Sequence, residues 1–380
     1  MRDDVIVSLL MQAWNGQLEL LQLIDQCSKL EQERRAPLAA ILYQTWLKRT
    51  PSTHAHAAYF NLGATLSNLG DLVASEEAYR QAIALSPGFI QPRLNLGLVL
   101  ERRGFLDQAV EEWLWVERNV PADTDEYKPF LLLALNNLGR VLEIKKEYRD
   151  ATDYLDRSLS IDPTQSDVLH HWVFLRMKQC CWPVYRPTGK VSPELMENST
   201  SALAMLAMTD DPAVQLAAAR RYADKKVLKD LPSLAKPGGY GHRKIRIGYC
   251  SSDFCLHPVA MLMVEMFESH DREKFEVYAY CWSPEDGSEV RKRVIAAMDH
   301  FQRIDQLGDE EAACLIREHE IDILVDLQGQ TAGARMNMLA YRPAPIQITY
   351  LGLPATTGLP FIDYVIADRF LLSFGGHLRL

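Results

Sequence analysis

Small and apolar positions recur along residues 56–163, where several key positions of the first unit return 34 positions later in the second. The paired positions are Leu62-Gly63 and Leu96-Gly97, Gly70 and Gly104, Tyr79 and Trp113, and Pro87 and Pro121. A third unit surrounds Leu138-Gly139 after a short insertion. Within residues 1–55, the second helix of an earlier, partial unit is indicated by Ala39, Tyr43, Trp46 and Pro51. A period of this length predicts stacked helix pairs, with glycine where two helices touch or where a first helix ends in a left-handed turn.

These units resemble the tetratricopeptide repeat, whose arrays stack into a superhelix with a concave face that usually binds peptide. Asn61, Asn95 and Asn137 fall at or near the first-helix face that lines such grooves. We expect their amides to hold an extended protein or peptide backbone, although side chains at these positions can also simply face water. A spacer or dimerisation arm is the alternative role for the array, so a homo-oligomer stays open.

Residues 164–243 lose the repeat pattern and predict a helical adaptor followed by a linker. One helix is expected at Ser166–Lys178, and Ser192-Pro193 and Asp211-Pro212 are typical of helix starts. Pro237-Gly238-Gly239 then marks the linker, because proline and glycine interrupt regular structure.

Residues 244–372 alternate apolar, β-rich runs with helical patterns. The predicted strands are Lys244–Cys250, Phe275–Trp282, Ile321–Leu327, Ile346–Leu351 and Asp363–Ala367, and the predicted helices are Val259–Glu268, Ser288–Met298 and Glu310–Glu318. Such alternation predicts a mostly parallel sheet with helices on both faces, and therefore an α + α/β chain. Polar turns follow several strands and are expected to converge on one edge, where Asp253 and Asp326 can cap helices or bind loop amides. None of these turns has the GxGxxG or Walker pattern, which leaves a generic NAD or ATP site unsupported.

The composition narrows the class of partner. The 380 residues carry 41 basic and 50 acidic side chains, a net charge of −9, which disfavours a general nucleic-acid or anionic-membrane binder. No apolar run reaches the roughly 18 residues that span a bilayer, and the start of the chain lacks the pattern of a signal peptide. The seven cysteines are scattered without a CxxC pair, so reduced thiols in a cytoplasmic protein are expected.

The α/β segment resembles the protein O-GlcNAc transferase and SPINDLY-like glycosyltransferases. The matching stretches are residues 246–254 with His257-Pro258, residues 275–278, Asp286-Gly287, residues 299–301, 321–327, 342–347 and 350–358, and Asp363-Tyr364. Together with the repeats, the resemblance covers nearly the whole chain. It implies a Rossmann-like lobe that is the first half of a GT-B fold, in which a nucleotide sugar lies between two lobes.

The resemblance also implies a reaction: transfer of a sugar from UDP-GlcNAc or a related donor to a serine or threonine of a protein, with no metal. Under it, His257 and His300 match active-site histidines, the first a candidate base. Donor-sugar contacts are implied for Leu351, Gly352, Pro354, Thr357 and Gly358. The alternatives are that His257 only begins a helix, that His300 only orders a short strand, and that the glycines only form turns.

Some positions depart from the family pattern. Gln330 stands where an aromatic residue is common, and the residues after His257-Pro258 lack a second histidine found in animal members. After residues 363–370 the family continues into a second lobe, whereas residues 373–380 show no helical or strand pattern and are expected to be an aberrant tail of a truncated product. The expected activity of this chain alone is therefore absent or weak. The alternative function is a non-catalytic repeat scaffold that binds peptides or an intact partner.

Overall fold

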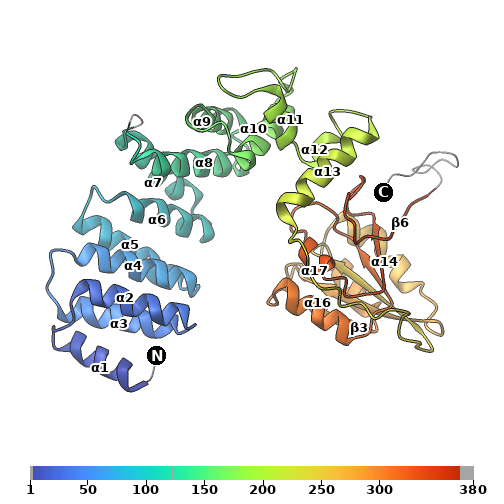
Figure 1. Ribbon diagram of the computed structural model, residues 1–380, viewed down its shortest axis with the longest axis horizontal. Helices are drawn as coiled ribbons and strands as arrows, with labels where there is room; N and C mark the ends of the chain where they lie inside the picture. Colours follow the sequence, from blue (N-terminus) through green and yellow to red (C-terminus); the bar gives the residue numbers. More distant parts are fainter. Residues whose placement is uncertain (1–2, 122–123, 369–380) are drawn as a thin grey trace. The chain divides into compact units, whose positions relative to one another are not determined.

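The computed structural model describes residues 3–121 and 124–368, so the predicted tail at 373–380 lies outside the described residues. The chain forms two compact units that meet between Ser199 and Thr200. The first unit consists of helices along its described length (Figure 1). They are α1 (Asp3–Trp14), α2 (Leu20–Gln32), α3 (Ala36–Arg49), α4 (Ala55–Asn68), α5 (Leu72–Leu85), α6 (Ile90–Arg102), α7 (Leu106–Asn119), α8 (Lys128–Ile144), α9 (Tyr148–Ile161), α10 (Ser166–Lys178) and α11 (Pro193–Ser199).

The predicted helix pairs are confirmed, because α4–α5, α6–α7 and α8–α9 follow the repeat register and α2–α3 forms the earlier pair. Glycine is required where the two helices of a pair touch. A Cβ on Gly63 would lie 2.7 Å from the ring of Tyr79, one on Gly97 would lie 2.4 Å from Trp113, and one on Gly139 would lie 2.2 Å from Leu155. Since real Cβ contacts are longer than this, any side chain there would push the pair apart.

The turn inside each pair needs a left-handed residue. Gly70 and Gly104 have φ of +84°, as the sequence predicts, and glycine adopts this conformation without strain. In the third pair the equivalent position is Lys146, with φ of +65°. The third repeat therefore keeps the turn geometry without the residue that best tolerates it.

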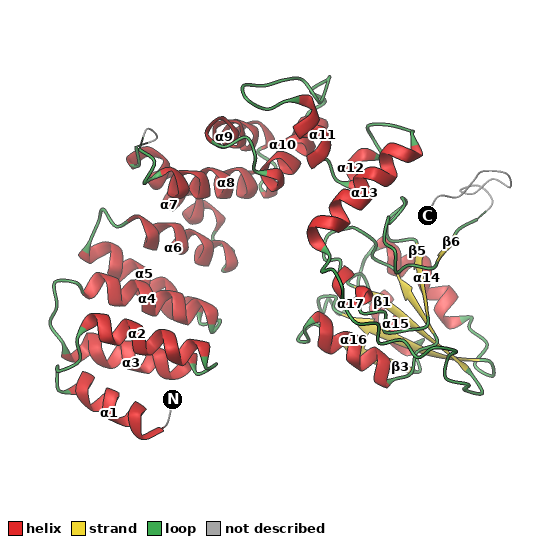
Figure 2. Ribbon diagram, in the orientation of Figure 1, coloured by secondary structure: helices red, strands yellow, loops and turns green. Residues whose placement is uncertain are grey.

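The second unit is built on a six-stranded sheet in the order β3-β2-β1-β4-β5-β6, with every neighbouring pair parallel (Figure 2). Its strands are β1 (Ile245–Ser251), β2 (Phe275–Cys281), β3 (His300–Arg303), β4 (Ile323–Asp326), β5 (Ile346–Tyr350) and β6 (Tyr364–Ile366). Its helices are α12 (Ala202–Met205), α13 (Pro212–Lys226), α14 (Pro258–Glu268), α15 (Glu289–Ala296), α16 (Asp309–Glu318) and α17 (Met336–Ala340).

Helices cover both faces of this sheet. Buried side chains of α14 and α15 pack with Ile247, Val277 and Val325 on one face. Residues of α13, α16 and α17 pack with Tyr280 and Leu324 on the other face. The predicted parallel sheet and the α + α/β class are confirmed. The predicted strand list omitted β3, because its four residues, His-Phe-Gln-Arg, are mostly polar and sit at the sheet edge.

The predicted adaptor does not form one body. Its helix at Ser166–Lys178 is confirmed as α10 and lies with α11 in the first unit, whereas α12 and α13 belong to the second. Asp211 caps α13 by accepting a hydrogen bond from the Ala213 N–H at 2.8 Å, as its sequence position indicated. The side of α13 that carries Ala219 packs on Leu353, just past the end of β5, which ties this helix to the sheet.

Two further properties concern the described residues as a whole. None of the helices within 3–121 and 124–368 is both long and apolar enough to cross a membrane. All seven cysteines fall inside those ranges as free thiols, and no disulfide constrains either unit.

Candidate active site at the carboxyl edge of the sheet

The loop after β1 is fixed by a glutamine from the loop after β4. The Gln328 Oε1 accepts hydrogen bonds from the Ser252 backbone N–H at 3.0 Å and from its hydroxyl at 2.8 Å. The amide nitrogen of the same side chain donates to the Thr331 Oγ1 and to the Ala332 carbonyl, both at 2.9 Å. With its oxygen and nitrogen both used inside the protein, Gln328 holds two strand ends together rather than facing a ligand.

Asp326 closes β4 and organises the turn that carries Gln328. Its two carboxylate oxygens accept the backbone N–H groups of Gln328 at 3.1 Å and Gly329 at 2.8 Å. The expectation that Asp326 binds loop amides is therefore confirmed. Burial raises the pKa of this carboxyl to about 6, even though the two N–H donors favour the charged form.

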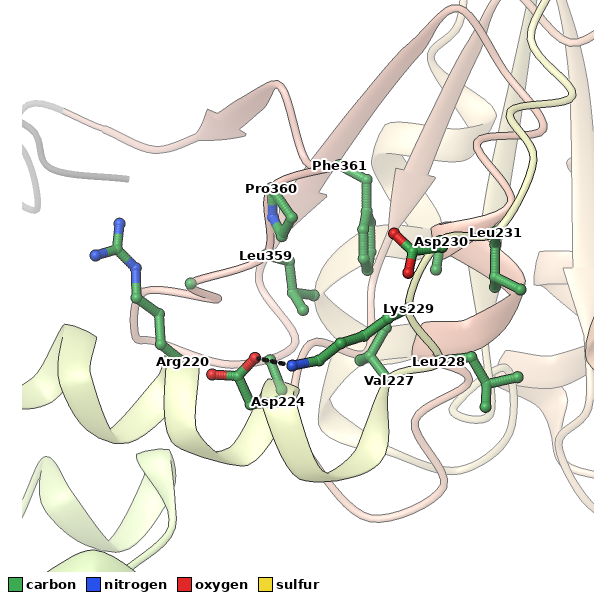
Figure 3. Close-up of a pocket in the computed structure, with 13 residues that line it drawn as sticks. Arg220, Asp224, Val227, Leu228, Lys229, Asp230, Leu231, Leu359, Pro360 and Phe361 are labelled. Carbon is green, nitrogen blue, oxygen red and sulfur yellow. Dashed lines mark ion pairs between the residues drawn. The ribbon is translucent and has the colours of Figure 1, made fainter.

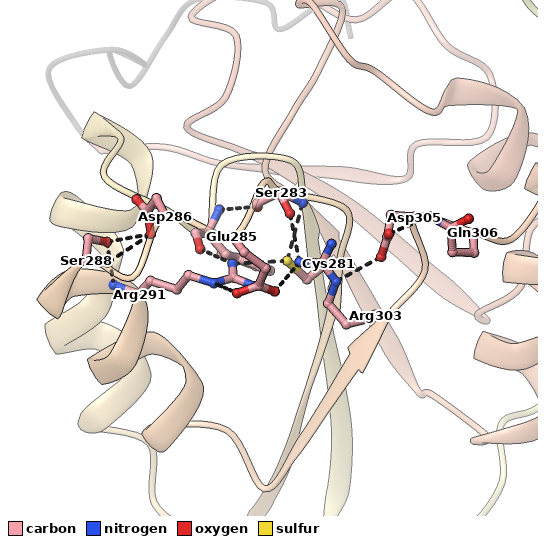
Figure 4. A network of polar contacts seen from close by, with 10 residues as sticks. Cys281, Ser283, Glu285, Asp286, Ser288, Arg291, Arg303, Asp305 and Gln306 are labelled. Atoms are coloured by element: carbon pink, nitrogen blue, oxygen red, sulfur yellow. Dashed lines mark hydrogen bonds and ion pairs between the residues drawn. The ribbon is translucent and has the colours of Figure 1, made fainter. Parts of the chain in front are cut away.

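A second network holds residues 254–256 from the side of β2 (Figure 4). The Ser283 hydroxyl oxygen accepts the Phe254 N–H at 2.8 Å. Arg291, whose side chain is 2% exposed, donates to the Phe254 carbonyl at 2.6 Å and binds both carboxylate oxygens of Glu285. The segment just before His257 is thus bonded at both its N–H and its C=O.

Asp286 completes this network. Its carboxylate accepts the Leu256 N–H, and this hydrogen bond, the largest effect, helps to hold the pKa of Asp286 below its ordinary value. The same carboxylate accepts the N–H and hydroxyl of Ser288, the N-cap of α15, at 3.1 and 2.9 Å. The loop that leads to His257 is therefore anchored to the start of a helix.

His257 is the N-cap of α14 and remains partly open to solvent, with its side chain 43% exposed. Its Nδ1 lies 3.3 Å from the Val259 N–H nitrogen and 3.6 Å from the Asp253 Oδ2. These contacts compete, because an Nδ1 that accepts from Val259 must be unprotonated, whereas one that faces Asp253 favourably carries the proton. In the second state, the Nε2 is left with a free lone pair and can act as a base.

His300 lies elsewhere on the sheet. It is the first residue of β3, its ring stacks on Tyr278 at 4.2 Å, and its Nε2 lies 2.9 Å from the Glu276 Oε1. His300 is in register with Tyr278, three residues before the carboxyl end of β2 at Cys281, which is roughly 10 Å along an extended strand. His300 therefore lies back from the edge of the sheet at which the loop carrying His257 begins.

The electrostatics of the His300 contact are those of an ion-pair cluster. Burial alone would raise the pKa of Glu276, but hydrogen bonds from His300 and from Arg246 hold it below its ordinary value. The Arg246 Nε donates to the Glu276 carboxylate at 2.9 Å. The alternative in which His300 serves to order a short strand agrees with these contacts.

The loop after β5 divides into two parts. Leu351 and Gly352 lie at the carboxyl end of β5, and a Cβ on Gly352 would approach the Leu327 carbonyl oxygen to 2.3 Å. This glycine thus lets the loops after β4 and β5 touch. Pro354, two residues further along the chain, is exposed. Thr357 is 8% exposed, and Gly358, with φ of +62°, would place a Cβ 3.1 Å from the backbone of Arg220.

Gln330, one of the departures from the family pattern, binds the part of this loop that contains Thr357 and Gly358. Its amide nitrogen donates to the Thr357 carbonyl and, at 3.2 Å, to the Ala219 carbonyl of α13. Thr357 and Gly358 are consequently packed between the sheet and α13, while Leu351, Gly352 and Pro354 stay closer to the edge with His257.

The three asparagines of the first unit occupy equivalent places, each just before a Leu-Gly pair, in α4, α6 and α8. The Asn61 amide donates to the Ala57 carbonyl at 3.0 Å, and the Asn95 amide lies 3.3 Å from the Tyr79 hydroxyl. The Asn137 side chain is 7% exposed, and its Nδ2 has no hydrogen-bond partner among the described residues. Of these three asparagines, Asn137 is therefore the one with a buried and unpaired N–H donor among the described residues.

Comparison with known proteins follows the same division of the chain. Residues 228–373 match the model of glycosyl transferase family 41, and residues 56–89 and 131–161 match models of the tetratricopeptide repeat. The second unit is therefore similar to O-GlcNAc transferases and SPINDLY-like glycosyltransferases.

Relatives from plants and animals match part of the chain. One is a probable UDP-N-acetylglucosamine–peptide N-acetylglucosaminyltransferase SEC from Arabidopsis thaliana, 38% identical over 171 residues, which are 42% of this chain and 18% of that protein. Another, the UDP-N-acetylglucosamine–peptide N-acetylglucosaminyltransferase of Caenorhabditis elegans, is 42% identical over 33% of this chain and 11% of its own. The chain thus spans less than a fifth of the length of these relatives.

One solved structure aligns with most of the chain. The O-GlcNAc transferase of Thermobaculum terrenum, studied as a mutant, aligns with 97% of this chain and 54% of its own, at 23% identity and a TM-score of 0.42.

The sequence did not predict the residues that build this edge of the sheet. Gln328 carries no signal beyond its place two residues after a strand-ending aspartate, and Arg291 falls among other charged residues of a predicted helix. A buried arginine cannot be told from an exposed one by its neighbours in sequence, because its partners, Phe254 and Glu285, come from other loops.

Proposed function

We propose that this chain is part of a glycosyltransferase that transfers GlcNAc from UDP-GlcNAc to serine or threonine hydroxyls of proteins held by the repeats. The observation that carries this proposal is the partly exposed His257, held on an anchored loop at the carboxyl edge of the family's parallel sheet. Open α/β sheets place their ligands at this edge.

In the proposed reaction, the His257 Nε2 takes the proton of the acceptor hydroxyl as the hydroxyl oxygen bonds to the anomeric carbon of the sugar. The bond between that carbon and the UDP oxygen breaks, UDP departs with the electron pair, and the configuration inverts. Asp253 stabilises the imidazolium that forms, since its Oδ2 lies 3.6 Å from the His257 Nδ1.

The donor sugar is proposed to contact the loop after β5, with Leu351, Gly352 and Pro354 nearest the edge. Thr357 and Gly358 are proposed to support this loop from behind, since both are packed against α13. His300 has no part in the proton transfer proposed here because it pairs with Glu276 on the amino-terminal side of the sheet.

The repeats are proposed to hold the acceptor by its backbone. Asn61, Asn95 and Asn137 recur once per helix pair, so amides at this spacing can bind an extended chain in register. The unsatisfied Nδ2 of Asn137 supports this role, since a buried donor without a partner costs free energy that a peptide carbonyl would recover.

The test is calorimetric titration of the whole chain with UDP-GlcNAc and with UDP, followed by mass spectrometry of acceptor proteins after incubation with the donor. Binding, with transfer that His257→Asn abolishes and His300→Asn retains, supports the proposal. Absence of heat at millimolar donor, together with absence of transfer, rejects the enzymatic role for this chain.

The alternative function, a repeat scaffold without catalysis, is supported by the same unpaired Nδ2 of Asn137, whose Oδ1 accepts a hydrogen bond from Arg140 at 3.3 Å. It predicts that peptides bind without any nucleotide sugar and that Asn137→Ala weakens them. Asn119→Ala is the matched control, because Asn119 is exposed and bonds only to its own helix at Trp115. Peptide binding without donor binding would favour the scaffold over the enzyme.

A further inference from the structure

A pocket of about 600 Å³ lies in the second unit between α13 with its following segment and the chain just before β6 (Figure 3). One wall is formed by Ala223, Val227 and Leu231. The opposite wall is formed by Leu359 and Phe361, which are 6% and 8% exposed. The volume falls within the range of small-molecule sites, about 300–1,000 Å³, and apolar walls of this kind are typical of them.

Four charged residues also line this pocket. Arg220 stands at one end and Asp230 at the other, with Lys229 and Asp224 between them (Figure 3). Lys229 and Asp224 pair with each other at 3.2 Å, so they largely neutralise one another. Arg220 forms no ion pair with any residue in the described part of the chain and is the free cation of the pocket.

The arginine is also held in place by its stem. A Cβ on Gly358 would lie 3.1 Å from the Arg220 Cγ, so the loop packs closely against the aliphatic part of this side chain. The guanidinium is exposed and extends outward from this end of the pocket (Figure 3). A fixed stem lowers the entropy lost when the guanidinium binds an anion.

We propose that this pocket binds a small amphipathic monoanion. Its aliphatic or aromatic body lies between Val227 and Phe361, and its carboxylate or sulfonate accepts hydrogen bonds from Arg220. A second negative charge at the far end of such a ligand would face Asp230 and be repelled, which selects a monoanion over a dianion. This pocket shares Gly358 with the loop after β5, but its proposed ligand does not depend on the transferase reaction.

The experiment uses the whole chain and two fluorescent probes of nearly the same shape. 1-Anilinonaphthalene-8-sulfonate has an aromatic body and one sulfonate, whereas N-phenyl-1-naphthylamine has the body without the charge. We expect saturable binding of the sulfonate at one site per chain. Arg220→Gln should weaken the sulfonate about tenfold, the loss typical of one charge-assisted hydrogen bond, and leave the neutral probe unchanged.

Lys225→Gln is the matched control, because Lys225 is exposed on the same helix but does not line the pocket. Val227→Phe, which fills the pocket, should remove both probes, and Leu228→Asp, an exposed change at the far end, should weaken both while circular dichroism stays native. Unsaturable binding, many sites per chain, or equal affinities in wild type, Arg220→Gln and Leu228→Asp would overturn the proposal. A failed UDP-GlcNAc titration would leave these outcomes unaffected, so the two proposals fail separately.

Discussion

The Asp253 Oδ2 lies 3.6 Å from the His257 Nδ1, while the Val259 N–H nitrogen lies 3.3 Å from the same atom. One imidazole nitrogen thus faces both an acceptor and a donor. The proton of the neutral ring decides which contact is favourable, and with it whether the exposed Nε2 is a donor or a base.

Asp253→Asn is expected to shift neutral His257 toward the tautomer that carries its proton on Nε2, because the carboxylate that favours Nδ1–H is lost. The measurement is the ¹⁵N chemical shift of both ring nitrogens at a pH where the ring is neutral. Glu265→Gln, an exposed change on the same helix, is the control. An unchanged ratio of tautomers would mean that Asp253 does not orient the ring.

Arg291→Met is expected to loosen the loop before His257. The Phe254 carbonyl loses a donor within a buried site, and the expected cost is about 2–4 kcal/mol in the free energy of unfolding. Hydrogen exchange at residues 254–256 should accelerate at the same time. Arg293→Met is the control, since the pair of Arg293 with Glu268 is exposed and should contribute no measurable stability. Equal effects of the two changes would contradict this role.

The buried Asp326 is expected to make the stability of the folded chain depend on pH. Its pKa is about 6 in the folded chain against an ordinary value of 3.8, so the folded state holds this proton more tightly than the unfolded state. The stability that this group contributes is therefore fully present below about pH 4 and is lost as the pH rises through about 6. The amount lost is roughly 1.4 kcal/mol for each unit by which the folded pKa exceeds the unfolded pKa.

The measurement is the free energy of unfolding by denaturant from pH 4 to 7, compared between wild type and Asp326→Asn. Asp326→Asn should remove this part of the decline, while the other titrating groups contribute equally to both proteins. A profile for Asp326→Asn that runs parallel to wild type across this interval would refute the assignment.

Lys146→Gly is expected to stabilise the third repeat by about 0.5–1 kcal/mol, because a left-handed lysine is strained where glycine is not. Thermal unfolding of the chain should report this gain. Gly70→Ala and Gly104→Ala, at equivalent positions with φ of +84°, should lose a similar amount. A loss of stability in Lys146→Gly would show that the lysine side chain contributes more than its backbone costs.

The sequence by itself determined the features that depend on near neighbours. The spacing of Gly63 and Gly97 from Tyr79 and Trp113 follows from helix geometry within one pair, and the structure confirms it. Each of the strands β1, β2, β4 and β5 is a short apolar run, so each could be predicted from its own residues. The loop amides bound by Asp326 lie only two and three residues after it, so this contact could be predicted too.

Only the tertiary structure decided which distant residues share a site. His257 and His300 both belong to matching stretches of sequence, yet the register of β2 with β3 puts His300 opposite Tyr278, where its ring contacts Glu276, back from the carboxyl edge. The contacts of Gln328 with Ser252 and of Arg291 with Phe254 likewise join separate loops. Local periodicity fixes each element, but pairing between elements depends on packing across the whole sheet, which no short window of sequence contains.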